Sequence, residues 1–496
     1  MHVLIEKFYT RVIMKGDYGG MGMLKSISLE NYKCFKRLDD FEIAPLTVLC
    51  GVNSSGKSSI LKSLLMLKQS FESNYDKNSL LFNGNYTTNG SYNDVVFSHK
   101  ASNKICFSNE FIIENSNFVP AFEKSTLDDL AHVLLIETNH IKQLDVIFTL
   151  ELRNKISSKY VHDNTIYSYC IEYNVTLAGS RTLCNKIRLI SQNNGKYDVQ
   201  IIIDSPAMNE QYTGCSCFFQ GLVLSKIIFG QNDRRIKNEI LSLVYSLAKI
   251  VAYQYKGVKY IAPIRKEPNR VYEILQDEND VGLYGESTPQ VLYSHKEDTI
   301  SCVNPPENEK FFTKRSKGKY IDQLNVWCDY LGMEPINFPE KNNCDDVINL
   351  NVGLSNYADV GFGVSQILPI IATGLLMKNH ETLVLQQPEI HLHPKMQMNF
   401  ADFLLATAYT GKNIIIETHS DHIINRLLRR IMEDKRFQSR VKFYFIDKNK
   451  EKAEEIKVDP VRGFINAPDD FFSQFGSESE AIFNASIRNT QKIRLG

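Results

Sequence analysis

The 496-residue sequence predicts an α/β fold in which helices cover both faces of a mainly parallel sheet. One observation is a five-residue apolar run, 46–50, which stops at Gly51 and is followed by a polar loop and a helical pattern from Lys57. A second is the alternation of short apolar strands with helical segments from residue 348 onward. A third is the 43% share of apolar residues, which is enough for a sizeable core.

The individual elements follow from apolar periodicity and from the polar turns between them. Residues 24–50 contain short apolar runs that predict strands, and residues 276–320 are polar and predict loops. We expect further strands over 144–152, 165–177, 186–190, 199–203, 257–263, 383–385, 413–417 and 441–446, and helices from 57, over 240–253, after 365, over 394–408 and over 421–433.

Composition excludes some classes of protein. The 57 basic and 57 acidic residues balance, which argues against a strongly basic nucleic-acid surface but leaves a local basic groove open. The ten cysteines are scattered, with only Cys215 and Cys217 close together, so we expect reduced thiols in a cytoplasmic protein. No run of about 20 apolar residues is present, so we expect no membrane partner.

The loop after the first predicted parallel strand matches a P-loop: Gly51, four residues, then Gly56-Lys57-Ser58. The glycines let backbone N–H groups approach phosphates, the lysine supplies charge to the β and γ phosphates, and the serine hydroxyl can hold Mg²⁺. ATP and Mg²⁺ are therefore the expected ligands. The predicted nucleotide-binding residues are Asn53, Ser54, Ser55, Gly56, Lys57, Ser58 and Ser59.

The apolar strand 383–385 occupies the place of a Walker B strand, which ends in an acid for the metal and often has a second acid to polarise water. Here those positions are Gln386 and Gln387, and the first acid is Glu389. Gln386 can contact a metal-bound water but has no charge, and Gln387 is a poor general base. We therefore predict good triphosphate binding and weak hydrolysis, with Gln386 at the metal and Gln387 and Glu389 as catalytic candidates.

His391 and His393 follow this strand closely. They could be metal ligands, but the spacing is loose and no third ligand is near in sequence. A structural or interface role is the favoured interpretation.

The segment 359–366 begins a predicted helix. Free N–H groups and a hydroxyl at a helix start can contact an anion, although the same pattern also describes an ordinary capped helix. The order of P-loop, long insertion, glycine-serine helix start and Walker B strand is the layout of the ABC-type ATPases, in which the helix start acts on the nucleotide of a second subunit. We therefore expect at least a head-to-tail dimer, with a trans signature of Gly361, Gly363, Ser365 and Gln366.

The strand 413–417 leads to His419, where ABC-type ATPases place a histidine against the γ phosphate. A single histidine at a strand end usually has no such role, but in this order of motifs we expect it to sense phosphate. Glu417, two residues earlier, is a possible extra acid.

These motifs divide the chain into five parts. We expect an N-terminal extension (1–22), an N-terminal ATPase lobe with the P-loop (23–110), an insertion (111–255), a C-terminal ATPase lobe with the signature helix, Walker B strand and switch histidine (256–450), and a small C-terminal module (451–496).

Four segments, 24–58, 261–268, 387–394 and 417–422, together resemble the RecF/SMC-like, OLD-related AAA family ATPases of bacterial anti-phage defence. The resemblance implies an ABC-type head with an N-terminal β-lobe and a central α+β insertion. Residues 459–475 look like the small C-terminal module of one subfamily. Within it the chain looks most like the Septu ATPases (PtuA), which implies an HNH nuclease partner (PtuB-like). The family usually has Glu where this chain has Gln386, which puts hydrolysis in doubt.

Related OLD nucleases continue into a TOPRIM nuclease domain, for which the chain after His419 is short and lacks the acidic pattern. We therefore expect no nuclease centre in this chain, and any cutting would be done by a partner. The resemblance implies an anti-phage ATPase that senses nucleotide and regulates that partner. The alternative is a DNA repair or recombination ATPase that clamps DNA directly. An ABC transporter motor is disfavoured.

Overall fold

The computed structural model describes residues 22–74, 79–114, 130–131, 133–134, 140–155, 163–178, 181–192, 195–204, 207–230, 238–274, 278–307, 314–339, 347–447 and 452–468. The expected N-terminal extension, apart from Gly22, and the expected C-terminal module beyond Pro468 lie outside the described residues.

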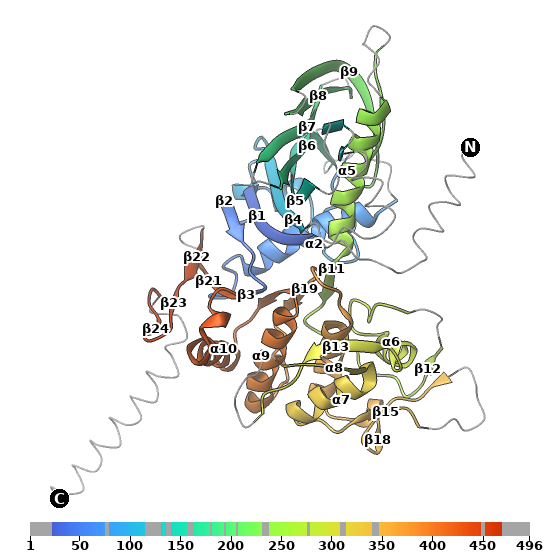
Figure 1. The fold of residues 1–496 in the computed structure, drawn as a ribbon, viewed down its shortest axis with the longest axis vertical. Coiled ribbons are helices and arrows are strands. Elements are labelled where there is room, and N and C mark those ends of the chain that lie inside the picture. Colours follow the sequence, from blue (N-terminus) through green and yellow to red (C-terminus); the bar gives the residue numbers. More distant parts are fainter. Residues whose placement is uncertain are drawn as a thin grey trace, which may run out of the picture.

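A nine-stranded antiparallel sheet forms the N-terminal lobe, in the order β10-β9-β8-β7-β6-β5-β4-β1-β2 (Figure 1). One face of each strand is buried, as the alternating burial along β4 and β5 illustrates. The strands are β1 (Met23–Tyr32), β2 (Phe35–Glu42), β4 (Ile105–Glu114), β5 (Ile141–Lys155), β6 (Asp163–Leu177), β7 (Thr182–Ser191), β8 (Tyr197–Ile203), β9 (Met208–Gln220) and β10 (Val223–Ile228).

The segment 111–255, expected as an insertion, continues this sheet. The expected boundary after residue 110 falls inside β4, which pairs with β1 on one side and β5 on the other. Helix α5 (Asn238–Lys256) then returns along the sheet and packs against α2 (Lys57–Glu72), the helix that follows the P-loop. The segment therefore shares one apolar core with the strands and the helix around the P-loop.

The second sheet has six strands in the order β11-β19-β20-β3-β21-β22. All neighbours are parallel except β21 and β22. Its strands are β3 (Leu46–Cys50), β11 (Val258–Ile261), β19 (Thr382–Gln386), β20 (Asn413–Glu417), β21 (Val441–Asp447) and β22 (Lys452–Ile456). The strand before the P-loop therefore lies beside β20, and β20 separates it from the Walker B-like strand β19.

Alternate side chains of this sheet enter two different cores. Val384 and Ile415 face the N-terminal core with α2 and α5, whereas Leu383, Leu385 and Ile416 face a second core. The second core is closed by α7 (Tyr320–Leu331), α8 (Phe362–Leu376), α9 (Pro394–Tyr409) and α10 (Asp421–Glu433). The prediction of a mainly parallel sheet with helices on both faces is confirmed.

Several described elements lie where the sequence predicts no helix or strand. Helix α6 (Thr288–His295) and the hairpin of β13 (Thr299–Val303) and β14 (Arg315–Lys319) lie in the region expected as loops, and no prediction covers α7. In α7 the buried residues Leu324, Trp327, Cys328 and Leu331 follow helical spacing, so a signal was present.

The remaining elements are short. They are α3 (Tyr92–Val95), η1 (Phe97–His99), η4 (Tyr357–Asp359), η5 (Lys435–Phe437), β12 (Tyr272–Glu273), β15 (Ile336–Asn337), β16 (Val347–Ile348), β17 (Asn351–Val352), β18 (Ser355–Asn356), β23 (Val458–Asp459) and β24 (Gly463–Phe464).

A buried ion-pair network joins α9 to α10. Arg430 donates through Nε to Asp402 Oδ1 at 2.7 Å and through Nη2 to Oδ2 at 3.0 Å, and neither side chain is exposed. Arg426 Nη1 and the hydroxyl of Tyr330 donate to the same Oδ2 at 2.9 and 2.7 Å. The network therefore joins the helix that follows the loop after β19 to the helix that follows His419.

Candidate nucleotide-binding site

The P-loop connects β3 to α2 and depends on its two glycines. Gly51 has φ +134° and Gly56 has φ +113°, a region that residues with a Cβ rarely adopt. A Cβ on Gly51 would lie 2.5 Å from the carbonyl oxygen of Ile446, and one on Gly56 would lie 2.3 Å from Cys34 Sγ. Backbone conformation and close packing both require glycine here.

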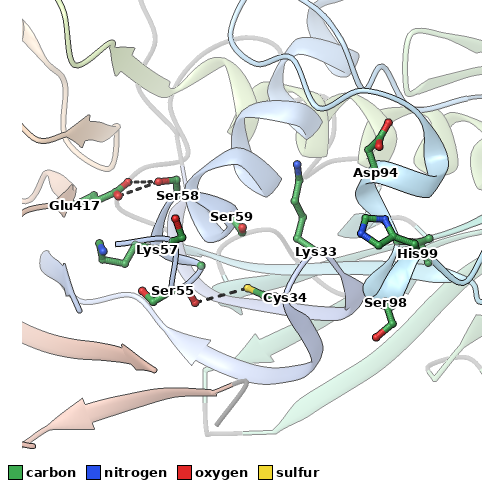
Figure 2. Close-up of a pocket in the computed structure, with 13 residues that line it drawn as sticks. Lys33, Cys34, Ser55, Lys57, Ser58, Ser59, Asp94, Ser98, His99 and Glu417 are labelled. Carbon is green, nitrogen blue, oxygen red and sulfur yellow. Dashed lines mark hydrogen bonds between the residues drawn. The ribbon is translucent and has the colours of Figure 1, made fainter. Parts of the chain in front are cut away.

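The loop opens into a cavity of about 380 Å³ (Figure 2). Of the predicted nucleotide-binding residues, all but Asn53 line it, and Asn53 is exposed. The other lining residues come from the turn between β1 and β2, from α3 and η1, and from the end of β20, and no sequence signal connected them. The lining is Lys33, Cys34, Ser54, Ser55, Gly56, Lys57, Ser58, Ser59, Asp94, Val96, Ser98, His99 and Glu417.

Lys57 is folded back onto its own loop. Its Nζ donates to the carbonyl oxygens of Gly51 at 2.9 Å and Val52 at 2.7 Å. Burial lowers the pKa of Lys57, while the nearby carboxylate of Glu417 acts in the opposite direction. The ammonium group is thus partly desolvated beside the cavity, where a phosphate oxygen could replace a carbonyl as its acceptor.

Glu417 is the acid nearest the P-loop serine. Ser58 Oγ lies 2.8 Å from Glu417 Oε1 and 2.9 Å from Oε2, and donates to the carboxylate (Figure 2). The strand order explains this contact, since Glu417 ends β20 and is in register with Leu49 of β3 and with Gln386 of β19. From the sequence, Glu417 is only a possible extra acid, because the order of the strands in the sheet is not visible there.

Gln386 turns its amide NH₂ group toward this carboxylate. Its Nε2 donates to Glu417 Oε2 at 3.2 Å, and its Oε1 accepts from the hydroxyl of Tyr260 at 2.6 Å. A carboxylate accepts hydrogen bonds only, so the amide orientation follows from the network. Burial raises the pKa of Tyr260 to about 12, which keeps its hydroxyl protonated as the donor.

The other two catalytic candidates of the Walker B loop, Gln387 and Glu389, are half-buried and do not line the cavity. Gln387 has φ +44°, and its backbone N–H donates to the carbonyl oxygen of Glu417 at 2.7 Å. Glu389 Oε1 accepts from the backbone N–H of His419 at 2.7 Å. Burial raises the pKa of Glu389. Neither side chain lines the cavity of this single chain.

His419 lies at the carboxyl end of β20, as predicted, and its side chain is exposed. Partial burial, followed by the charge of Lys57, lowers its pKa. His419 does not line the cavity either. The structure brings it close to Lys57 and Glu389 but not into the lining of the single-chain pocket.

Of the four predicted signature residues, the two glycines are at least partly exposed, whereas the side chains of Ser365 and Gln366 are buried. Gly361 is exposed and precedes α8, and Gly363 is half-buried. Ser365 Oγ donates to the carbonyl oxygen of Phe362 at 2.8 Å, and Gln366 Oε1 accepts from the backbone of Arg265. As folded, the two buried side chains could reach another subunit's nucleotide only if the helix start opened.

The two histidines after β19 have structural contacts. His393 caps α9 by accepting from the backbone N–H of Lys395 at 3.3 Å. His391 makes an edge-to-face ring contact with Phe362, with centroids 4.7 Å apart. The start of α8 therefore rests on the loop after β19.

The residues present fit Mg²⁺ and a triphosphate. The hydroxyl of Ser58 and the carboxylate of Glu417 are oxygen donors, which Mg²⁺ prefers, and Mg²⁺ commonly needs only one or two carboxylates beside phosphates and water. Within the described segments, no group of three or more His, Cys, Asp or Glu side chains could hold a metal alone. The buried Ser55 hydroxyl in the cavity wall has no partner within the described part of the chain, and a phosphate could accept from it there.

The sequence matches the AAA ATPase domain family over residues 23–214 and 290–424. The match spans well over half of the chain and includes the P-loop, the signature helix, β19 and His419. The chain belongs to this family of AAA ATPases. No curated protein matches the sequence significantly.

Solved structures similar to this one include heads of SMC proteins. One is an SMC head bound to the C-terminal winged-helix domain of ScpA (TM-score 0.38, 9% identity, 88% of this chain and 99% of that chain). Another is the SMC head domain from Thermotoga maritima (TM-score 0.32, 10% identity, 88% and 99%). A third, derived from Pyrococcus furiosus, has an extended coiled coil and is bound to the C-terminal domain of ScpA (TM-score 0.37, 9% identity, 88% and 96%).

Among the described helices, none combines the length and apolar character that crossing a bilayer requires.

Proposed function

We propose that this AAA ATPase binds ATP with Mg²⁺, hydrolyses it slowly and uses nucleotide occupancy as its signal. The observation that carries the proposal is a complete P-loop opening into a cavity, in a sheet whose Walker B-like strand ends in the uncharged Gln386. Binding needs the loop amides, a lysine and a serine, and the proposal assigns these parts to Lys57 and Ser58. Fast hydrolysis needs an acid beside the attacking water, and the amide side chain of Gln387 is a poor base.

Each residue has a proposed part in binding. Lys57 exchanges its contacts with loop carbonyls for the β and γ phosphates, and the buried Ser55 hydroxyl donates to a phosphate oxygen. When bound, Mg²⁺ would neutralise charge on the phosphates and would be held at Ser58. Glu389 is proposed to orient water, since it is the first acid after β19 and its carboxylate contacts the backbone N–H of His419. His419 is proposed to contact the γ phosphate.

We propose that two subunits pair head to tail and that each P-loop faces the signature of its partner. Support comes from the exposed Gly361 and the half-exposed ring of Phe362, which rests on the loop after β19. Nucleotide in such an interface would act as a switch, because it binds the paired state better than the open one.

For the biological role we propose a cytoplasmic anti-phage ATPase, similar to the Septu ATPase, that regulates an HNH nuclease partner and contacts DNA directly or through that partner. The support is the combined sequence resemblance of the four motif segments described above. The division into an extension, two ATPase lobes, an insertion and a C-terminal module belongs to the same proposal. Direct DNA clamping is the competing role.

The first experiment measures ATP binding and hydrolysis by the full chain, with Lys57→Ala as the binding control and Gln386→Glu as the rescue. We expect tight binding with little hydrolysis, loss of binding in Lys57→Ala, and faster hydrolysis in Gln386→Glu. Brisk hydrolysis by the unmodified chain would refute the sensor role. Strong, salt-sensitive DNA binding by the isolated chain would favour the clamp, whereas a stable complex with an HNH protein would favour the defence role.

A further inference from the structure

We infer that Glu417, at the end of β20, is the carboxylate that holds the Mg²⁺ of the bound nucleotide, in the place of the acid missing at Gln386. The inference rests on the proposed ATP binding and assigns the metal to a strand other than the Walker B-like one.

The position of β20 makes this assignment possible. It lies between β3 and β19 with both neighbours parallel, so the ends of all three strands meet at one edge of the sheet. Both oxygens of Glu417 lie within 3 Å of Ser58 Oγ, at 2.8 and 2.9 Å. The serine of a P-loop is itself a metal ligand, so a cation bound to Ser58 would be within reach of this carboxylate.

The charge of Glu417 has no cation within hydrogen-bond distance among the described residues. Its side chain is only 5% exposed, and the groups that donate to it, the hydroxyl of Ser58 and the amide of Gln386, are both neutral. Lys57 is close enough to act electrostatically, but its hydrogen bonds go to loop carbonyls. A buried carboxylate is costly without a counter-charge, and a divalent cation would supply one.

Gln386 is the less suitable ligand as the site is arranged. Only its amide oxygen could coordinate a cation, and that oxygen accepts from Tyr260 at 2.6 Å. The NH₂ group that faces the site is a donor and instead steadies the carboxylate of Glu417. Gln386 is therefore a positioning residue, and the charge at the metal comes from the neighbouring strand.

The test measures how much Mg²⁺ strengthens nucleotide binding. The dissociation constant of a slowly hydrolysed fluorescent ATP analogue is determined for the full chain in EDTA and in excess Mg²⁺, and the ratio of the two values is the Mg²⁺ gain. Electron paramagnetic resonance counts the Mn²⁺ bound per chain in the presence of the same analogue. The variants are Glu417→Gln, Gln386→Ala and, with a shorter carboxylate, Glu417→Asp.

We expect Glu417→Gln to lower the Mg²⁺ gain at least about tenfold and to lose the bound Mn²⁺, because even supporting groups around a metal are worth about 10–100-fold in affinity. Its affinity in EDTA should not fall, because the substitution removes a negative charge beside the phosphates, and a circular dichroism spectrum like that of the unmodified chain verifies folding. Gln386→Ala should keep most of the gain. If Glu417→Gln does not fold, Glu417→Asp tests the same point, with an intermediate loss expected.

A full Mg²⁺ gain in Glu417→Gln, or its loss in Gln386→Ala alone, would overturn the assignment and leave the proposed ATP binding intact. Failure of the unmodified chain to bind the analogue with or without Mg²⁺ would overturn the proposed function and this inference with it.

Discussion

Replacing the buried acid of the α9–α10 network, Asp402→Asn, tests the packing of the two helices that follow the loops of the site. Asp402 accepts from Arg430 twice, from Arg426 once and from the hydroxyl of Tyr330 once. The asparagine has nearly the same shape but no charge. The change therefore leaves the guanidinium of Arg430, which is 0% exposed, without its main counter-charge.

The expected loss follows from these contacts. Removing one partner of a buried ion pair costs about 3–5 kcal/mol, since the remaining charge stays desolvated. Arg430 Nη1 keeps its 2.7 Å contact with Glu433, whose side chain is 38% exposed. This remaining partner compensates in part, so we expect the free energy of unfolding to fall by about 3 kcal/mol, the lower end of the range.

The single tryptophan of the chain reports on this region. Trp327 lies on α7, is 1% exposed, and has its ring centroid 5.8 Å from that of Tyr330 and 5.1 Å from that of Phe403. Urea unfolding followed by tryptophan fluorescence therefore measures the stability of the core around Asp402 directly.

Two controls make the result specific. Asp39→Asn removes a pair with Arg37 in which both side chains are more than half exposed, and should cause no measurable change. The double change Asp402→Leu and Arg430→Met removes both charges and should recover part of the loss. A fall below about 1 kcal/mol for Asp402→Asn, or no recovery in the double variant, would refute the reasoning.

Two further predictions concern stability elsewhere in the chain. Gly221→Ala should lower the free energy of unfolding by about 1–3 kcal/mol more than Gly214→Ala, measured by urea unfolding followed by circular dichroism. Both glycines have positive φ, but only a Cβ on Gly221 would meet backbone, 2.3 Å from the carbonyl oxygen of Ser70. Equal losses in the two variants would contradict the clash. Lys412 is buried, and burial lowers its pKa to about 8, so the folded state disfavours its charge. Between pH 8 and the ordinary lysine pKa of 10.5, the unfolded chain binds more protons at Lys412 than the folded chain does. The free energy of unfolding should therefore rise with pH relative to Lys412→Met, by at most about 1.4 kcal/mol per pH unit. A difference between the two proteins that does not change with pH would contradict this.

Local patterns were sufficient for much of the fold. The spacing of apolar residues predicted α5 and α10, and the glycine-rich loop between a strand and a helix predicted the P-loop. These signals work because helix and strand periodicity are properties of a few neighbouring residues. Nothing local in the sequence indicates that β5 pairs with β4, so that the strands of segment 111–255 extend the sheet that begins before it.

The sequence by itself determined the phosphate-binding loop, the AAA ATPase character of the chain and the glutamine, Gln386, at the end of the Walker B-like strand where an acid is expected. The tertiary structure decided which side chains meet at the loop. It placed β20 between β3 and β19, and so brought Glu417 against Ser58, although the two residues lie 359 positions apart. The physical reason is that strand order depends on the packing of whole helices and sheets, whereas a motif depends only on residues that are adjacent in the chain.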